Sequence, residues 1–194
     1  MSPNMEQDDI LIHRAKHGDL DALQQLFFRY DKTVLSIAAR YVKSADDAKD
    51  IYQEVFLKLY RGIRQFEQRS EFSTWLFRIA TNVCLSHKTR ESRLQHKRAT
   101  VPEDDDDDAI GEPKDPSSEH ESPLQKTADA ELDEKVRNAL EELSPRQKMV
   151  FVLKHYEDHT LAEIAKMLEC SEGAVKKYLF EATRRLRFLL QDVR

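Results

Sequence analysis

The sequence predicts an all-α protein, with two small helical domains joined by a flexible acidic linker. Three observations support this fold class. The 194 residues include only 4 glycines and 6 prolines, apolar residues recur at helical spacing, and no segment alternates as a half-buried strand would. Because 40% of the residues are hydrophobic and 35% are charged, the chain can form small cores beneath a highly charged surface.

Charge divides the chain into three parts. Residues 102–134 hold 14 acidic and 2 basic side chains, whereas the segments on either side are mildly basic. The acidic segment has few large apolar residues, so it cannot bury enough surface to offset the entropy of ordering. We therefore expect an N-terminal domain at residues 1–98, a disordered linker at 99–132 and a C-terminal domain at 133–194.

Four helices are expected in the N-terminal domain. The first covers about 7–17 and ends at Gly18. Asp19 caps a second, long helix, whose apolar positions are Leu23, Leu26, Phe27, Tyr30, Val34, Ile37, Ala38 and Tyr41. The third runs from about Asp46 to Phe66, and the fourth from Ser70 or Ser73 to the mid-90s. Each helix has one apolar face and is expected to bury it.

The C-terminal domain has well-marked helix starts. A helix is expected at about 129–142, and "SPRQ" then forms a capping box in which Ser144 is the N-cap and Gln147 reaches back. "TLAE" repeats the device with Thr160 and Glu163. After a tight turn, Ser171 precedes another amphipathic run. Two helices joined by a tight turn are typical of a helix-turn-helix that reads DNA.

The last helix has two distinct faces. Its apolar positions are Val175, Leu179, Ala182, Leu186 and Leu189. The opposite face carries Lys176, Lys177, Phe180, Arg184 and Arg187. The apolar spacing predicts a buried face, and the basic face suits nucleic-acid contacts.

The third helix carries a charged stripe opposite its apolar face. The stripe consists of Asp47, Asp50, Glu54, Lys58 and Arg61, with Gln53 beside it. Two interpretations are open for this stripe: a solvated surface, or a docking face for a basic protein partner.

The fourth helix has the residues of a nucleic-acid contact. Its tail holds five basic residues and one acidic residue between Lys88 and Arg98, which suits phosphates, while asparagine and threonine on one face suit base edges. The preceding loop, with Phe66 and Phe72, could hold an unstacked base. Alternatively these aromatic residues belong to the core, which is the expected place of Trp75.

Two long motifs resemble a known family. "DAKDIYQEVFLKLYRGIRQFEQRSEFSTWLFRIATNVC" resembles the second conserved region of bacterial sigma factors of the extracytoplasmic-function group. "LSPRQKMVFVLKHYEDHTLAEIAKMLECSEGAVKKYLFEATRRLR" resembles their C-terminal promoter-reading region. The resemblance implies a factor that binds core RNA polymerase, opens promoter DNA at the minus-ten element and reads the minus-thirty-five element. It also implies a role in a stress or envelope response, and an anti-sigma factor as a partner.

The resemblance also implies site residues. The positions that bind the coiled coil of the polymerase clamp are Asp47, Asp50, Gln53 and Glu54, while Lys49 stands where the family often has another acid. The minus-ten positions are Phe66, Arg78, Asn82 and Lys88. The minus-thirty-five positions are Lys176, Lys177, Phe180, Glu181 and Arg184. The family commonly has a basic residue where this chain has Glu181, whose carboxylate could accept from cytosine N4 or repel phosphate.

The linker has a further implied role. In the family this connector passes through the polymerase toward the active centre, along a path that also holds RNA. The five aspartates at 104–108 could therefore mimic nucleic acid in a basic channel. The alternative is a soluble spacer that reduces binding to random DNA.

Other function classes fit less well. A stand-alone helix-turn-helix regulator would need a sensing front domain, usually with a mixed sheet, and the front half has no strand pattern. An RNA-binding module of the stacked-sheet type is excluded for the same reason. No glycine-rich phosphate loop, nucleophile with a base or metal-ligand cluster occurs, so we expect no enzyme activity, cofactor or metal.

Several individual residues support a cytoplasmic, metal-free protein. His155 and His159 lie one helical turn apart but have no third ligand nearby in sequence. Cys84 and Cys170 are expected to be reduced, buried thiols. The N-terminus lacks the features of a signal peptide, and no apolar run approaches the roughly 18 residues of a membrane helix.

Overall fold

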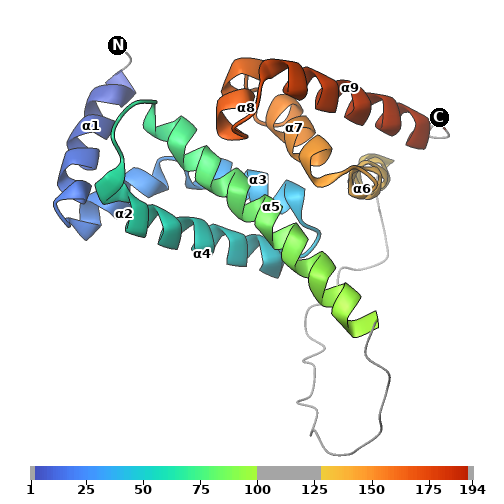
Figure 1. Cartoon of the computed structure of the whole chain (residues 1–194), viewed down its shortest axis with the longest axis horizontal. Coiled ribbons are helices and arrows are strands. Elements are labelled where there is room, and N and C mark those ends of the chain that lie inside the picture. The colour runs from blue at the N-terminus through green and yellow to red at the C-terminus, as the bar shows by residue number, and fades with distance from the viewer. Residues whose placement is uncertain (1–2, 100–127, 192–194) are drawn as a thin grey trace, which may run out of the picture.

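The computed structural model describes residues 3–99 and 128–191, and every regular element within them is a helix (Figure 1). The elements are α1 (Pro3–Lys16), α2 (Leu20–Phe28), α3 (Asp31–Tyr41), α4 (Ala45–Gly62), the 3-10 turn η1 (Ile63–Gln65), α5 (Phe72–Ala99), α6 (Ala128–Glu141), α7 (Pro145–His155), α8 (Leu161–Met167) and α9 (Glu172–Leu189). The predicted all-α fold class is confirmed. None of the described helices is long and apolar enough to cross a bilayer.

The acidic segment lies mostly outside the described residues. Residues 100–127, which include the five aspartates, belong to that undescribed part. Residues 128–132, predicted as the end of the linker, form the first turns of α6.

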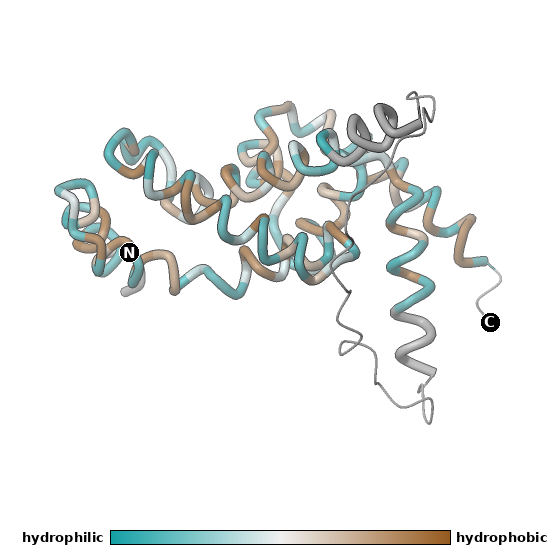
Figure 2. Tube along the Cα trace, turned by 90° about the horizontal axis from the view of Figure 1, so that it is seen from below, coloured by the Kyte–Doolittle hydropathy of each residue, from teal (hydrophilic) through white to brown (hydrophobic). Residues whose placement is uncertain are grey.

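The front half packs its helices around one core. α1 lies on α2, and α4 lies against both α3 and α5 (Figure 1). Hydrophobic and hydrophilic residues are interspersed along each helix (Figure 2), as expected for helices that bury one face. The largest fully buried side chains of this half are Tyr41, Phe27, Leu23, Leu26, Ile37, Ile51, Leu59, Ile63 and Leu76.

One long helix predicted after Asp19 is two helices in the structure. α2 ends at Phe28, and α3 begins at Asp31. The break is held from α1, because Asp8 accepts a hydrogen bond from the Tyr30 hydroxyl and pairs with Arg29 at 2.9 Å. Asp8 is buried, so these contacts hold Arg29 and Tyr30 next to α1. The chain therefore turns between α2 and α3. Apolar spacing continued across the break, so periodicity alone could not locate it.

Four predicted helix starts, at Asp19, Ser144, Thr160 and Ser171, are confirmed by their caps, whereas α1 begins at Pro3, ahead of the predicted residue 7, and α5 begins at Phe72. Asp19 accepts from the Ala22 backbone amide, and Ser171 accepts from that of Ala174. Ser144 and Thr160 both form complete capping boxes, with Gln147 and Glu163. A capping residue of this kind contributes about 0.5–2 kcal/mol, so these short helices begin at defined positions.

The rear half is a helix-turn-helix, formed by α8 and α9, that is supported by two further helices, α6 and α7. α7 and α8 both pack on α9, which is the second helix of the motif. α6 packs against the far end of α9 through a small cluster that includes Leu140, Leu143, Ala182 and Leu186. This support leaves the opposite face of α9 uncovered within the described parts of the chain.

The two halves pack on each other. α7 and α8 lie against α3 and α5, and one apolar cluster runs through both halves. In Figure 1, α5 crosses the front of the molecule with α7 and α8 beside it. The relative position of the two halves could not be inferred from the sequence.

Candidate functional site

The acidic stripe of α4 is directed away from the core. Asp50 and Gln53 are exposed, while Glu54 pairs with Lys58 at 3.1 Å and Asp47 lies 3.7 Å from His87. The opposite face is buried through Ile51, Val55 and other apolar residues. All four predicted polymerase-contact side chains are therefore at least partly accessible on one side of α4.

An exposed leucine lies on the same side, and sequence reasoning missed it. Leu57 is 49% exposed, and it lies one turn after Gln53 and Glu54. Tyr60, at the next position along this side, is half exposed as well. Leu57 and Tyr60 do not belong to the set of apolar positions that α4 buries. An apolar residue outside that set is the one sequence signal that could have identified them. The α4 face thus combines acidic side chains with exposed apolar ones that follow them along the helix, and such a mixture suits a protein-docking surface.

The fourth predicted helix presents its nucleic-acid candidates unequally. Asn82 of α5 is exposed. Arg78 pairs with Glu169 at 3.1 Å, and Lys88 pairs with Glu141 at 3.2 Å. Both acids belong to the rear half. The two cations of α5 therefore contact the rear half as well as solvent.

Phe66 lies in the core of the front half. Its side chain is only 4% exposed, and its ring packs 4.8 Å from that of Trp75 and 5.8 Å from that of Phe72. Its carbonyl oxygen accepts a hydrogen bond from Lys16 at 2.9 Å. In this conformation the ring is packed into the core beneath the loop and is almost wholly covered.

A pocket of about 200 Å³ nevertheless opens at this loop. Its walls include Gln68 and Ser70 of the loop and, unexpectedly, Asp8 and Asp9 of α1. Gln68 has a left-handed backbone (φ 54°) and donates to Asp9 at 3.0 Å. The sequence predicted the loop, but not that α1 would complete the wall, because the two segments meet only through tertiary packing.

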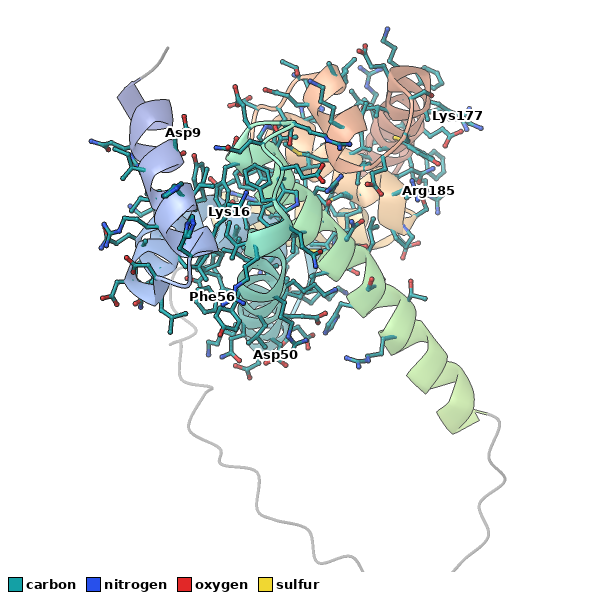
Figure 3. The ribbon with its side chains drawn as sticks, turned by 60° about the vertical axis from the view of Figure 1, so that its left-hand side comes forward. Asp9, Lys16, Asp50, Phe56, Lys177 and Arg185 are labelled. Atoms are coloured by element: carbon teal, nitrogen blue, oxygen red, sulfur yellow. The ribbon has the colours of Figure 1, made fainter. Side chains whose placement is uncertain are left out.

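The outer face of α9 is basic and aromatic. Lys176, Lys177, Phe180 and Arg184 are all exposed, as predicted. A groove of about 680 Å³ runs along this face and continues to Phe188, which is 66% exposed and was not predicted. Asp50 on α4 and Lys177 on α9 lie on well-separated parts of the molecule (Figure 3).

Glu181 differs from the other predicted α9 residues, because its side chain is hydrogen-bonded to a residue of another helix. Its carboxylate accepts a hydrogen bond from Gln147 of α7 at 2.9 Å, and Lys177 approaches to 4.0 Å. The same Gln147 accepts from the Ser144 backbone amide in the capping box. The cap of α7 therefore also positions a side chain of the helix predicted to read DNA.

The histidines and cysteines considered in the sequence as metal ligands or reactive groups lie in surroundings that suit neither role. The His155 ring packs on Phe151 and the His159 ring on Phe77, at 4.5 and 5.4 Å. No cluster of three metal-ligating residues occurs within the described ranges. Both cysteines are free, and burial raises the pKa of the Cys84 thiol to about 12, so this thiol stays protonated and unreactive at neutral pH.

Comparison with known families agrees with this geometry. Residues 26–94 match the model of Sigma-70 region 2, and residues 133–186 match that of Sigma-70, region 4. The first match spans α3 to most of α5, with part of α2. The second spans most of α6 and all of α7 and α8, together with most of α9.

Curated relatives match over nearly the full chain. The ECF RNA polymerase sigma-E factor of Escherichia coli strain K12 is 32% identical over 179 residues, which cover 90% of each chain. The RNA polymerase sigma-H factor of Pseudomonas aeruginosa is 29% identical over 192 residues, with 97% of this chain and 96% of the relative covered.

Solved structures share the fold. The sigma factor RpoE in complex with the anti-sigma factor NepR from Bartonella quintana has a TM-score of 0.62 at 23% identity, covering 88% of this chain and 98% of the other. CnrH in complex with the cytosolic domain of CnrY has a TM-score of 0.64 at 22% identity, covering 95% and 97%. The 32% identity to the sigma-E factor over 90% of each chain, together with the two family matches, shows that the chain belongs to the bacterial RNA polymerase sigma factors of the extracytoplasmic-function group.

Proposed function

We propose that the protein binds core RNA polymerase, recognises and melts promoter DNA, and thereby directs transcription initiation. The observation that carries this proposal is the presence of two different accessible faces on one chain. The α4 face is acidic with an exposed leucine, whereas the α9 face is basic and aromatic. A protein partner suits the first face, and the phosphate backbone and base edges of DNA suit the second.

Each half has its own role in the proposal. Asp47, Asp50, Gln53 and Glu54 contact the clamp coiled coil of the polymerase, and Leu57 extends this contact along α4. Asn82 and the loop pocket hold an unstacked base of the minus-ten element. α9 enters the major groove of the minus-thirty-five element, where side chains reach base edges.

The setting follows from these roles. The protein acts in the cytoplasm, where polymerase and promoter DNA are found, and performs no catalytic chemistry of its own. An anti-sigma factor that covers these faces would regulate it, and a stress or envelope signal would release it.

Reconstituted transcription tests the proposal. The chain is added to core polymerase with a library of promoter fragments, and the transcripts are sequenced from their start sites. We expect transcripts that share paired upstream elements and that are absent without the chain. Transcripts that start at the same sites with and without the chain would contradict the proposal. A stand-alone regulator, the alternative, would instead bind duplex DNA specifically without core polymerase.

Asn82→Ala is expected to impair melting and to spare polymerase binding. Asn82 is exposed, so its removal leaves the fold intact, while an unstacked base loses a polar partner that replaces its lost pairing. Permanganate reactivity of promoter thymines measures the melting, and a core-binding titration provides the control. Full reactivity across a panel of minus-ten variants would refute this role of Asn82.

Glu181→Arg is expected to change base preference within the minus-thirty-five element. A good base contact contributes about 1–3 kcal/mol of discrimination, and the substitution also breaks the 2.9 Å hydrogen bond from Gln147. The measurement is selection of duplex sites from a randomised pool by the holoenzyme.

Gln147→Glu is a companion variant, because it keeps Glu181 and the capping box but replaces the donor to Glu181 with a carboxylate. If Glu181 reads a base from its held position, both variants shift the selected motif. Identical motifs from the wild type and Glu181→Arg would rule out base reading by this residue.

A further inference from the structure

The charge on the accessible side of α4 changes sign along the helix. Asp47 and Asp50 lie in its first half, whereas Arg61 lies in its last turn. These residues lie on the side of α4 opposite the buried Ile51 and Val55. From Asp50 to Arg61 the helix rises about 16 Å, at about 1.5 Å per residue. The docking face of α4 therefore has an acidic end and a basic end.

A pocket of about 280 Å³ opens at the basic end, where η1 packs on α1. In Figure 1 the end of α4 lies beside α1 and α2. The apolar side chains of this α1–α2 pocket include Leu20 at the start of α2 and Tyr60 of α4, which are 59% and 50% exposed. Arg61 and Arg64 line it as well. Because Tyr60 and Arg61 also belong to the accessible side of α4, the pocket continues the docking face.

The two arginines of the α1–α2 pocket pair with no carboxylate in the part of the chain that the structure describes. The acid that lines the pocket, Asp19, is already engaged, because it pairs with Arg14 at 2.8 Å and accepts from the Ala22 backbone amide. A β-carbon at Gly18 would lie 3.7 Å from the Arg64 guanidinium, so Arg64 reaches back over the turn between α1 and α2. Guanidinium groups that lack a partner attract carboxylates, which they can bind with two parallel hydrogen bonds.

We propose that the α1–α2 pocket is a second docking point for core RNA polymerase, and that it receives a polymerase segment in which a carboxylate lies next to an apolar side chain. The inference rests on the proposed function for the identity of the partner. Charge complementarity and continuity with the α4 face support this occupant. Basic side chains of the polymerase meet the acidic end of α4, and acidic ones meet the pocket. A reversed orientation would bring like charges together at both ends, so the two ends fix the direction in which the polymerase lies along α4.

Charge reversal in the pocket tests the inference. Arg61→Glu combined with Arg64→Glu is expected to weaken binding to core polymerase about tenfold or more, because each arginine loses a carboxylate partner and the new acids repel it. The titration is done without promoter DNA, so the loss reports protein contacts alone. Both arginines are exposed, and thermal unfolding should confirm that the fold is intact. Lys32→Glu combined with Lys166→Glu is the matched control, since it makes the same charge change at exposed positions outside the pocket and α4, and it should weaken binding much less.

Photo-crosslinking identifies the occupant. The wild-type chain with p-benzoylphenylalanine in place of Leu20 is mixed with core polymerase and irradiated, and the crosslinked peptide is sequenced by mass spectrometry. We expect a polymerase peptide that contains an acidic residue beside an apolar one. The same reagent at Ile10, which is 61% exposed and lies outside the pocket, should crosslink far less. At Asp46, next to the acidic end of α4, it should give a peptide rich in basic residues.

The outcomes separate this inference from the proposed function. A wild-type affinity in the Arg61 and Arg64 double variant would overturn the inference, as would a Leu20 crosslink to polymerase no stronger than that of Ile10. A Leu20 peptide without an acidic residue would overturn it too. If wild-type chain binds core polymerase in these experiments, any such result leaves the proposed function standing. If the wild type does not bind at all, the proposed function fails and the inference fails with it.

Discussion

Replacing Asp50 and Glu54 together with lysine is expected to weaken binding to core RNA polymerase severely and to abolish transcription that depends on the chain. Both residues lie on the accessible side of α4, opposite Ile51 and Val55, which are buried. Each lost contact costs about 1–3 kcal/mol if it is largely desolvated in the complex. Charge reversal adds repulsion from a basic partner, so the effect exceeds that of simple truncation.

Fluorescence titration of the labelled chain with core polymerase measures the affinity. Asp21→Lys combined with Glu142→Lys makes the same change in net charge at exposed positions outside α4, and should reduce the affinity much less. Leu57→Ala tests the exposed leucine of the face without any change in charge. An unchanged affinity in the Asp50 and Glu54 double variant would remove α4 from the docking surface.

Replacing Glu141 with alanine is expected to lower the free energy of unfolding by about 3–5 kcal/mol, the typical result of breaking a buried ion pair. Lys148 is only 4% exposed, and its ammonium group donates to Glu141. Lys88 approaches the same carboxylate at 3.2 Å. Without Glu141, the Lys148 charge would remain in the interior with no carboxylate partner.

Urea unfolding followed by circular dichroism measures this loss. Glu142→Ala is the adjacent control, because its carboxylate is well exposed and lies 3.8 Å from Arg185. Exposed pairs of this kind typically contribute about 0–1 kcal/mol. Equal stability of the two variants would show that the pair between Glu141 and Lys148 contributes nothing to folding.

The same pair predicts a dependence on pH. Burial alone would raise the pKa of Glu141, but the hydrogen bonds and charges of Lys148 and Lys88 outweigh it and lower the pKa below the ordinary 4.5. A carboxyl group whose pKa is lowered by folding stabilises the protein above its unfolded pKa, and this contribution is lost as the pH falls through the folded pKa. The wild type should therefore lose more stability below about pH 4.5 than Glu141→Ala does.

Local features of this protein were predictable from the sequence. Apolar spacing identified the helices, and short polar motifs located their starts, since a capping side chain acts on backbone amides only two or three residues away. Ser144, Thr160 and Ser171 all cap as predicted. Accessible charged faces were predictable for the same reason: on α4 and α9, the residues opposite the apolar stripe are the ones that remain accessible.

Tertiary packing decided the rest, because it joins segments that spacing cannot relate. Asp8 of α1 holds Arg29 and Tyr30, and so divides one predicted helix into two. The Phe66 ring packs against Trp75 in the core, although its sequence position in a polar loop was compatible with exposure.

The sequence by itself determined most of the helices, the caps at Asp19, Ser144, Thr160 and Ser171, and the two chemically different faces, because these depend on contacts within a few residues. Only the tertiary structure decided that Arg78 and Lys88 meet acids of the rear half. Arg78 and Glu169 are 91 positions apart in the sequence, and Lys88 and Glu141 are 53 positions apart. The acidic segment between them has no pattern from which their contact could be predicted. Such pairing depends on how two apolar surfaces fit together, and this fit is a property of the folded chain.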